Sequence, residues 1–172
     1  DSSNRFCYLT PNGDLIPIVA EQTSQAWTYK LSDINGFQIP YTMTSGRLFI
    51  SMDKPVYMKG IVDGAGNIGV VQPDLNNPND ANVNTYFDWI EFTVHSGGFW
   101  GNTTQVDQFC FPITMSMYND GDVYYRSVGI TESRESIFQA FESLPQAEFR
   151  TLVQRPYRIV APCKGEFRVG RT

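Results

Sequence analysis

The sequence predicts a mainly β protein, an antiparallel barrel or sandwich with a short two-helix segment near residues 131–155. Up to residue 130, short apolar runs alternate with turn sequences, and no helical period lies between them. After residue 130 the apolar residues take the spacing of one helical face. At 172 residues the chain is most simply one domain, 1–172, large enough to bury a core.

The expected strands of the first half are separated by turn sequences. RFCYLT and LIPIVA flank the Pro-Asn-Gly-Asp turn at residues 11–14. AWTYKL is expected to be a strand too, because Asn35-Gly36 follows it and is a type I′ turn dipeptide. Further expected strands are GRLFISM, PVYMKGIV and IGVVQ. Residues 73–85, rich in Asn and Pro, form either a plain connector or the rim of a groove.

The segment after residue 130 predicts two helices and a return to strand. Ser133 is a plausible N-cap for the first helix, with Glu135 in its first turn. Pro145 suits the first turn of the second helix. The apolar positions of the first helix are Ile137, Phe138, Phe141 and Leu144, and those of the second are Phe149, Leu152 and Val153. YRIVAP then has strand character.

Charge and composition narrow the possible partners. The formal net charge is −5, from 13 basic and 18 acidic side chains, and no basic stripe indicates a nucleic-acid partner. The apolar runs are too short for a membrane span, so no membrane partner is expected. Charged residues make up only 18%, which implies a surface rich in amides and hydroxyls, as in many secreted and sugar-handling proteins. The chain begins DSSNRF without Met or an apolar leader, so we expect a mature secreted, extracellular form or an excised piece.

Three cysteines, Cys7, Cys110 and Cys163, lie far apart in the sequence and form no CxxC motif. With one histidine in the chain, a zinc site is not expected. This spacing is equally compatible with two states of the cysteines. Two of them form a disulfide and leave one free thiol, or all three are buried as small hydrophobic residues.

Two acids, Glu91 and Asp107, lie on either side of a glycine-rich turn in a stretch, 86–109, without lysine or arginine. They are either solvated strand residues or groups that face each other across a site. Residues 86–95 alternate, and we expect the mostly apolar set that begins at Tyr86 and includes Asp88 to face the core. The other set combines aromatic rings, an acid, a hydroxyl and an imidazole, as sugar sites do: Phe87, Trp89, Glu91, Thr93 and His95.

The turn SGGFWGN is centred near Phe99, and each acid lies eight positions from that residue. A simple hairpin would therefore place Glu91 roughly opposite Asp107, with Cβ atoms about 5 Å apart. Two carboxylates in one groove suit glycoside hydrolysis, one as proton donor and the other as base or nucleophile. Inverting enzymes keep the two groups roughly 6.5 to 9.5 Å apart, so a bulge, a register shift or divergent side chains are expected to widen the gap.

The stretch FDWIEFTV…NTTQVDQF resembles the core motif of family 64 of the glycoside hydrolases, the laminaripentaose-producing β-1,3-glucanases. The likeness extends upstream through SGRLFISMDKP, VDG and VQP, and downstream through FQAF and RIVAP. It covers most of the chain from about Ser45 onward. The resemblance implies a thaumatin-like β-barrel beside a mixed α/β domain, with a wide acidic groove between the two.

The resemblance also implies an inverting hydrolysis of β-1,3-glucan without metal or cofactor. The catalytic acid would be Glu91 and the catalytic base Asp107. The substrate contacts that the motif implies are Thr93, Trp100 and Thr104. Trp89 and His95, on the same face of the strand as Glu91, complete the set of expected substrate contacts.

The family's α/β domain needs more chain than 172 residues, so it is expected to be absent or truncated here. A missing segment or a second chain would then complete the groove. The alternative function is a non-catalytic β-glucan-binding or antifungal thaumatin-like protein. Such proteins usually carry many disulfides, which three cysteines fit poorly.

Overall fold

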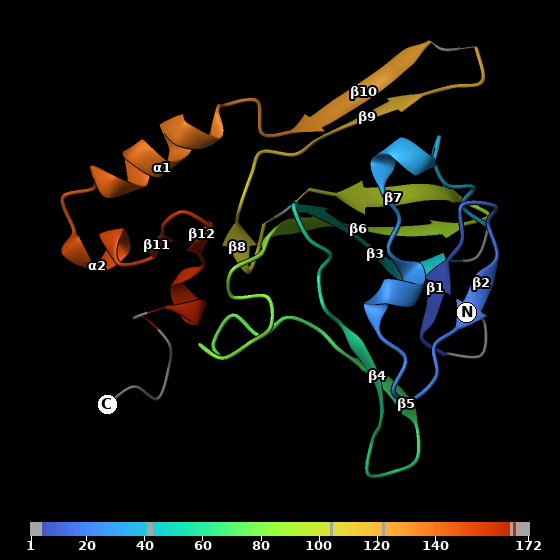
Figure 1. Cartoon of the computed structure of the whole chain (residues 1–172). Coiled ribbons are helices and arrows are strands. Elements are labelled where there is room, and N and C mark those ends of the chain that lie inside the picture. Colours follow the sequence, from blue (N-terminus) through green and yellow to red (C-terminus); the bar gives the residue numbers. More distant parts are fainter. Residues whose placement is uncertain (1–4, 41–42, 104, 122, 166, 168–172) are drawn as a thin grey trace.

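The computed structural model in Figure 1 describes residues 5–40, 43–103, 105–121, 123–165 and 167. The mainly β fold with two helices after residue 130 is confirmed. The strands are β1 (Cys7–Leu9), β2 (Leu15–Pro17), β3 (Met43–Met52), β4 (Lys59–Val62), β5 (Ile68–Val71), β6 (Tyr86–His95), β7 (Gly98–Asn102), β8 (Gln108–Phe109), β9 (Thr114–Tyr118), β10 (Tyr124–Gly129), β11 (Val153–Gln154) and β12 (Arg158–Val160). The helices are α1 (Arg134–Glu142) and α2 (Ala147–Arg150).

The described strands form five small antiparallel sheets. The central sheet has the order β3-β6-β7, and a second three-stranded sheet has the order β11-β12-β8. The pairs β1-β2, β4-β5 and β9-β10 make two-stranded ribbons. In Figure 1 the β9-β10 ribbon extends away from the rest of the molecule, on the same side as α1.

Strand β6 is covered on both faces. Phe87 is fully buried in a cluster with Val56 and Met58. On the opposite face, Ile90 packs against a second cluster that contains Cys110 and its neighbours. The set beginning at Tyr86 faces the core as expected, since Tyr86 and Ile90 pack against the Cys110 cluster. The other face is covered too near the start of the strand, where Phe87 packs in the Val56 cluster.

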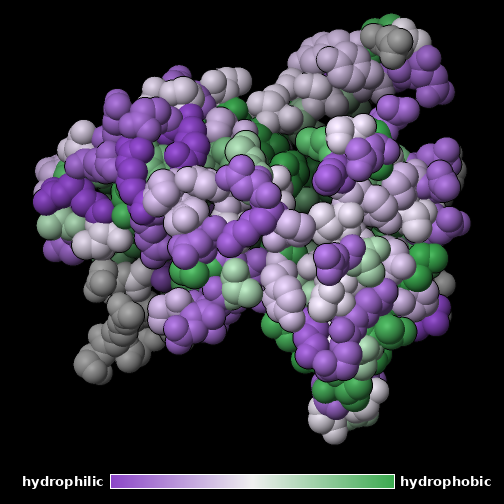
Figure 2. Space-filling model, in the orientation of Figure 1, coloured by the Kyte–Doolittle hydropathy of each residue, from purple (hydrophilic) through white to green (hydrophobic). Residues whose placement is uncertain are grey.

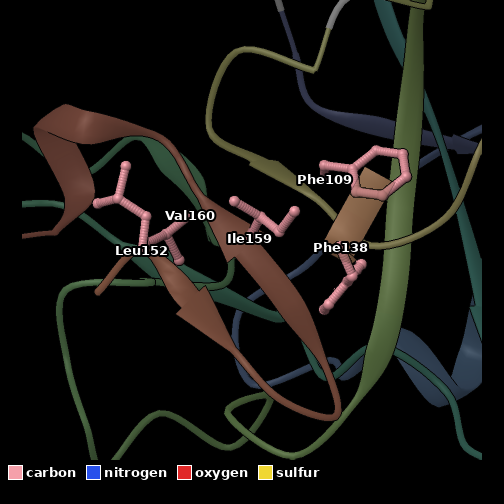
Figure 3. Close-up of a cluster of buried hydrophobic side chains, with 5 residues drawn as sticks. All are labelled: Phe109, Phe138, Leu152, Ile159 and Val160. Atoms are coloured by element: carbon pink, nitrogen blue, oxygen red, sulfur yellow. The ribbon is translucent and has the colours of Figure 1, made fainter. Parts of the chain in front are cut away.

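A third cluster joins the helices to the second sheet. Its buried members are Phe109, Phe138, Leu152, Ile159 and Val160. Figure 3 shows Phe109 and Phe138 near one another on one side of Ile159, with Leu152 and Val160 on its other side. Phe138 is completely buried, with the Arg134 and Arg155 guanidinium carbons 4.1 and 4.7 Å from its ring centre. Figure 2 shows hydrophilic residues over the outer surface of this helical part.

The predicted caps of the helical segment are largely confirmed. The Ser133 side chain accepts the Ser136 N–H at 3.1 Å, and Glu135 lies in the first turn. The second helix is shorter than expected, because it ends at Arg150 and leaves the buried Leu152 outside it. Pro145 precedes its N-cap rather than lying in its first turn.

The segment AWTYKL is not a strand. It contains the end of a 3-10 helix, Ser24–Trp27, and the start of another, Leu31–Asp33. Gly36 has φ +144, and no strand pair spans the Asn35-Gly36 dipeptide among the described residues. Tertiary contacts explain the difference, since the buried Ser24 hydroxyl donates to Val56 O at 2.6 Å and accepts the Met58 N–H at 3.0 Å.

A buried cation connects β12 to the loop before β6. Arg158 is 2% exposed, and its Nη2 donates to the carbonyls of Asn82 (3.0 Å), Val83 (3.2 Å) and Thr85 (2.7 Å). Its guanidinium carbon lies 5.1 Å from the centre of the Phe87 ring. These contacts hold the start of β6 against the second sheet.

The three cysteines are free, so the disulfide alternative is not realised. Cys110 is fully buried, and burial raises the pKa of its thiol to about 11. It therefore stays a neutral, hydrophobic side chain. Separately, no helix in the described part of the chain is long and apolar enough to cross a membrane.

We predict that Phe138→Ala lowers the free energy of unfolding by about 3 to 5 kcal/mol, because it empties the centre of the third cluster. Phe149→Ala, at a residue 36% exposed, is the matched control and should cost far less. Urea denaturation followed by tryptophan fluorescence measures both. Equal losses in the two variants would show that Phe138 is not at the centre of this core.

Candidate active site

Glu91 lies in the middle of β6, opposite Arg47 of β3 on one side and Asn102 of β7 on the other. The Arg47 Nη2 atom is 2.8 Å from Glu91 Oε1. Arg47 also donates from Nη1 to Gln72 Oε1 at 2.6 Å. Because the two charged side chains are 42% and 39% exposed, solvent weakens their attraction, and the pair contributes at most about 1 kcal/mol to stability.

A groove of about 420 Å³ lies over the central sheet at Glu91. Its lining comes from β3, β6 and β7 and is mainly polar: Ser45, Gly46, Arg47, Glu91, Phe92, Thr93, Trp100, Gly101 and Asn102. Thr93 lies across from Trp100 in the β6–β7 register, and its Oγ1 accepts the Ser45 N–H at 3.1 Å. The groove thus combines a carboxylate, hydroxyl and amide groups and a large ring.

Trp100 provides an accessible aromatic surface beside the groove. It is 50% exposed and stacks on His95, with ring centres 4.1 Å apart and an angle of 22° between the ring planes. His95 is exposed at the end of β6 and stabilises the indole from one side. A half-exposed indole can stack on the apolar face of a pyranose ring.

Another predicted substrate contact packs against the core instead. Trp89 is packed with Phe49 and Phe87, at ring-centre distances of 5.5 and 6.2 Å, within the Val56 cluster. It does not line the groove as the structure describes it. Thr104 lies outside the described residues.

Asp107 is just before β8, on the connection from β7. Its backbone oxygen accepts the Ala161 N–H at 2.9 Å, and its Oδ1 lies 3.3 Å from Lys164 Nζ. Both contacts come from the C-terminal part of the described chain. Asp107 is not among the described residues that line the Glu91 groove.

The expected hairpin pairing of Glu91 with Asp107 is wrong. The chain turns at Ser96-Gly97, so Glu91 pairs with Asn102 instead. Gly98 follows the turn with φ +136, a conformation that favours glycine. The tighter turn moves the centre of the hairpin toward the N-terminus and leaves Asp107 beyond the end of β7.

The lack of a cation within residues 86–109 does not leave the two acids unpaired. Each carboxylate receives a cation from a distant part of the chain, Arg47 for Glu91 and Lys164 for Asp107. The sequence gives no local sign of these pairs, because strand pairing and the C-terminal segment create them.

Asp88 is a buried acid near the site whose role the sequence analysis missed. It is 1% exposed, and its Oδ2 accepts from Gln105 Nε2 (2.7 Å), the Cys110 N–H (2.7 Å) and the Phe111 N–H (3.4 Å). Burial raises the pKa of this carboxyl from its ordinary value of 3.8 to about 6, and the hydrogen bonds oppose the shift. The sequence did contain a signal for this role, because Asp88 is the one acid in the otherwise apolar set of the alternating strand.

A second, larger hollow of about 500 Å³ is a less suitable site for this chemistry. Uncharged residues line it, mainly from the loops that flank β8 and β10 and from α1: Thr103, Gln105, Phe109, Gly129, Ile130, Ile137 and Phe141. In the part of the chain that the structure describes, no group of three or more His, Cys, Asp or Glu side chains could hold a metal ion.

A polar groove with a carboxylate and a stacking indole is typical of carbohydrate-active proteins. Comparison with known families agrees, since the model of glycoside hydrolase family 64, described as beta-1,3-glucanase, matches residues 1–169. The chain belongs to family 64 of the glycoside hydrolases.

Individual relatives are similar over parts of their length. The chain is 34% identical over 112 residues to a glucan endo-1,3-beta-glucosidase of Arthrobacter sp. (strain YCWD3), which is 64% of this chain and 19% of that protein. A laminaripentaose-producing beta-1,3-glucanase from Paenibacillus barengoltzii, solved with laminarihexaose, is 38% identical with a TM-score of 0.83, over 98% of this chain and 43% of that one. A beta-1,3-glucanase domain from Clostridium beijerinckii is 30% identical with a TM-score of 0.83, over 95% of this chain and 47% of that one.

The chain therefore spans less than half the length of these solved structures and about a fifth of the curated relative. The expectation that the family's α/β domain is absent or truncated in this chain stays a prediction.

The pKa of Asp88 predicts a pH dependence of stability. The folded protein keeps the Asp88 proton up to about pH 6, whereas the unfolded chain loses it near 3.8. The contribution of this group to stability is therefore complete below the lower value and is lost as the pH rises through about 6. Asp88→Asn removes the titration while keeping an oxygen acceptor.

Between pH 4 and 7 the free energy of unfolding of the unmodified protein should fall relative to that of Asp88→Asn, by up to about 2 to 3 kcal/mol. Urea denaturation of the two proteins at each pH measures the difference. The comparison is needed because other carboxylates change stability with pH in the opposite direction. Glu135 and Glu142 are examples, since their ion pairs with Arg155 lower the pKa values of both side chains. A constant difference across this range would contradict the assignment.

Proposed function

We propose that this protein hydrolyses β-1,3-glucan by an inverting mechanism in which Glu91 is the general acid and Asp107 the general base. The observation that carries the proposal is the position of Glu91. It lies in a polar groove beside the exposed Trp100, on a strand within the residues that the family model matches. The oligosaccharide in the Paenibacillus barengoltzii structure, laminarihexaose, supports β-1,3-glucan as the substrate class.

In this mechanism Glu91 gives its proton to the glycosidic oxygen as the bond from that oxygen to the anomeric carbon breaks. Asp107 removes a proton from a water molecule that attacks the anomeric carbon from the opposite face of the ring. The new bond forms on the side opposite the leaving group, so the configuration inverts. Neither step requires a metal or an organic cofactor.

Arg47 must release Glu91 before the acid can carry a proton into the reaction. Its second hydrogen bond, to Gln72, gives the guanidinium a partner that does not depend on Glu91. We propose that a bound glucan breaks the Arg47–Glu91 ion pair and that Arg47 stays at the groove edge through Gln72.

Trp100 and Thr93 are the proposed substrate contacts in the groove, the first by stacking and the second through its hydroxyl. We propose that His95 acts through Trp100, against which it packs. The proposed site of action is outside the cell, at a glucan-containing wall. The alternative, a protein that binds β-glucan without cleaving it, differs in one measurable respect, since only the enzyme releases reducing sugar from laminarin.

We predict that Glu91→Gln lowers turnover of laminarin by several orders of magnitude and leaves laminarin binding largely intact, because the amide has no acidic proton to donate. Reducing-sugar release and isothermal titration calorimetry measure the two quantities. The matched control is Glu21→Gln, which also removes a carboxylate from an exposed ion pair, with Lys59, and should keep full activity. Normal turnover of Glu91→Gln would remove Glu91 from the mechanism.

A second prediction concerns the stereochemistry of the product. Because Asp107 activates water rather than attacking the sugar, hydrolysis should release the α-anomer first. Proton NMR of the reaction in its first minutes distinguishes the anomers before they interconvert. An initial β-anomer would indicate retention and would assign Asp107 the role of nucleophile. Asp107→Asn should keep only a small residual activity in either case.

A further inference from the structure

We infer that Asp88 is a positioning residue, whose carboxylate holds the segment 105–111, and with it Asp107, in place relative to Glu91. This inference rests on the proposed function, because it gives Asp88 a role only through Asp107. Asp88 itself is buried and does not line the groove among the described residues.

The segment that carries Asp107 has little regular structure of its own. Strand β8 is only Gln108–Phe109, and residues 105–107 before it are irregular. On one side, the pairing of β8 with β12 and the bond from Ala161 N–H to Asp107 O fix this segment to the C-terminal sheet. That sheet does not contain Glu91, so these bonds alone do not determine how the two acids are spaced.

The connection to the Glu91 strand comes from side chains. Asp88 Oδ2 accepts from Gln105 Nε2 and from the Cys110 N–H, each at 2.7 Å. The Gln108 side chain adds a bond from Nε2 to Phe87 O on the same strand. The two Asp88 contacts lie two residues before Asp107 and three residues after it, so they restrain the segment from both ends.

Asp88 can serve as a fixed reference because β6 is the central strand of its sheet. Asp88 and Glu91 are three residues apart on this strand, which corresponds to about 10 Å along it. They point to opposite faces, Asp88 toward the Cys110 segment and Glu91 toward the groove. The pairing of β3 with β6 includes both residues, with Asp88 opposite Ile50 and Glu91 opposite Arg47, so a shift of Asp88 relative to Glu91 would disrupt this ladder.

Burying an ionised carboxylate costs free energy, because the group loses its hydration. Its advantage is that one oxygen can accept several N–H groups at once, as Oδ2 does here. A misplacement of a catalytic group by about 1 Å can cost on the order of 10²-fold in rate. The rigid attachment of the proposed base is therefore the advantage that the buried acid provides.

The first test is hydrogen exchange of the purified protein, followed by mass spectrometry. Asp88→Ala should speed exchange in peptides that cover 105–111 and leave those of β6 and β7 unchanged. Asp88→Asn, which can keep an oxygen at the Oδ2 position, should restore most of the protection. Asp63→Ala is the matched control, because Asp63 also accepts loop N–H groups, from Ala65 and Asn67, but between β4 and β5.

The second test is kinetic. On laminarin, Asp88→Ala should lower kcat by about 10²-fold with KM changed only a few-fold, Asp88→Asn should recover most of the loss, and Asp63→Ala should match the unmodified protein. In an Asp107→Asn background the Asp88→Ala change should cost almost nothing further, since the group that it positions is already gone. A purely structural role would lower activity equally in both backgrounds.

If Asp88→Ala does not fold, Gln105→Ala removes one of the two 2.7 Å bonds and leaves the backbone contacts of the carboxylate. It should show a smaller change of the same kind in exchange and in kcat. Unchanged exchange at 105–111, or equal losses with and without Asp107, would overturn the inference. If Glu91→Gln and Asp107→Asn keep normal turnover, the proposed function fails instead, whatever the exchange data show.

Discussion

Strand β6 has neighbours along both edges and buried side chains on both faces, and most of the molecule is placed relative to it. β3 and β7 pair with its edges, while the Val56 and Cys110 clusters cover its faces. Such a strand cannot slip by one residue, because a slip would exchange the two faces and expose both clusters. The position of Glu91 follows from this constraint, since it lies where the cover on its face ends and the groove begins.

Local patterns were enough to predict the elements that depend on local chemistry. The cap at Ser133 and the first helix follow from side-chain bonding and helical spacing, and the first hairpin follows from the Pro-Asn-Gly-Asp turn. The prediction of a strand at AWTYKL was wrong because its conformation depends on bonds from Ser24 to the segment just before β4, more than thirty residues away. The second helix was predicted too long, because Leu152 is buried after the helix ends, where apolar spacing no longer reports helical structure.

The sequence predicted which residues belong to the candidate site better than it predicted how they are arranged. Glu91, Thr93 and Trp100 were selected from the motif and alternation, and the structure places all three at one groove. The partner of Asp107 could not be found this way. A symmetric count around Phe99 ignored the position of the turn, and the contacts of Asp107 come from residues more than fifty positions away. Trp89 shared a face with Glu91 and still belongs to the core, because one face of a strand can be buried at one end and open at the other.

The attachment of β8 to β12 affects the order in which a newly synthesised chain can mature. The central sheet needs residues up to about Asn102, so the Glu91 half of the site can form while later residues are still in the ribosome. β8 pairs with β12, and the Asp107 carboxylate contacts Lys164, so the other half has to wait until that stretch has emerged. Asp107 can therefore take its place only after β12 and Lys164 have emerged, and truncated translation products that stop before β12 would contain the groove but lack the arrangement proposed for catalysis.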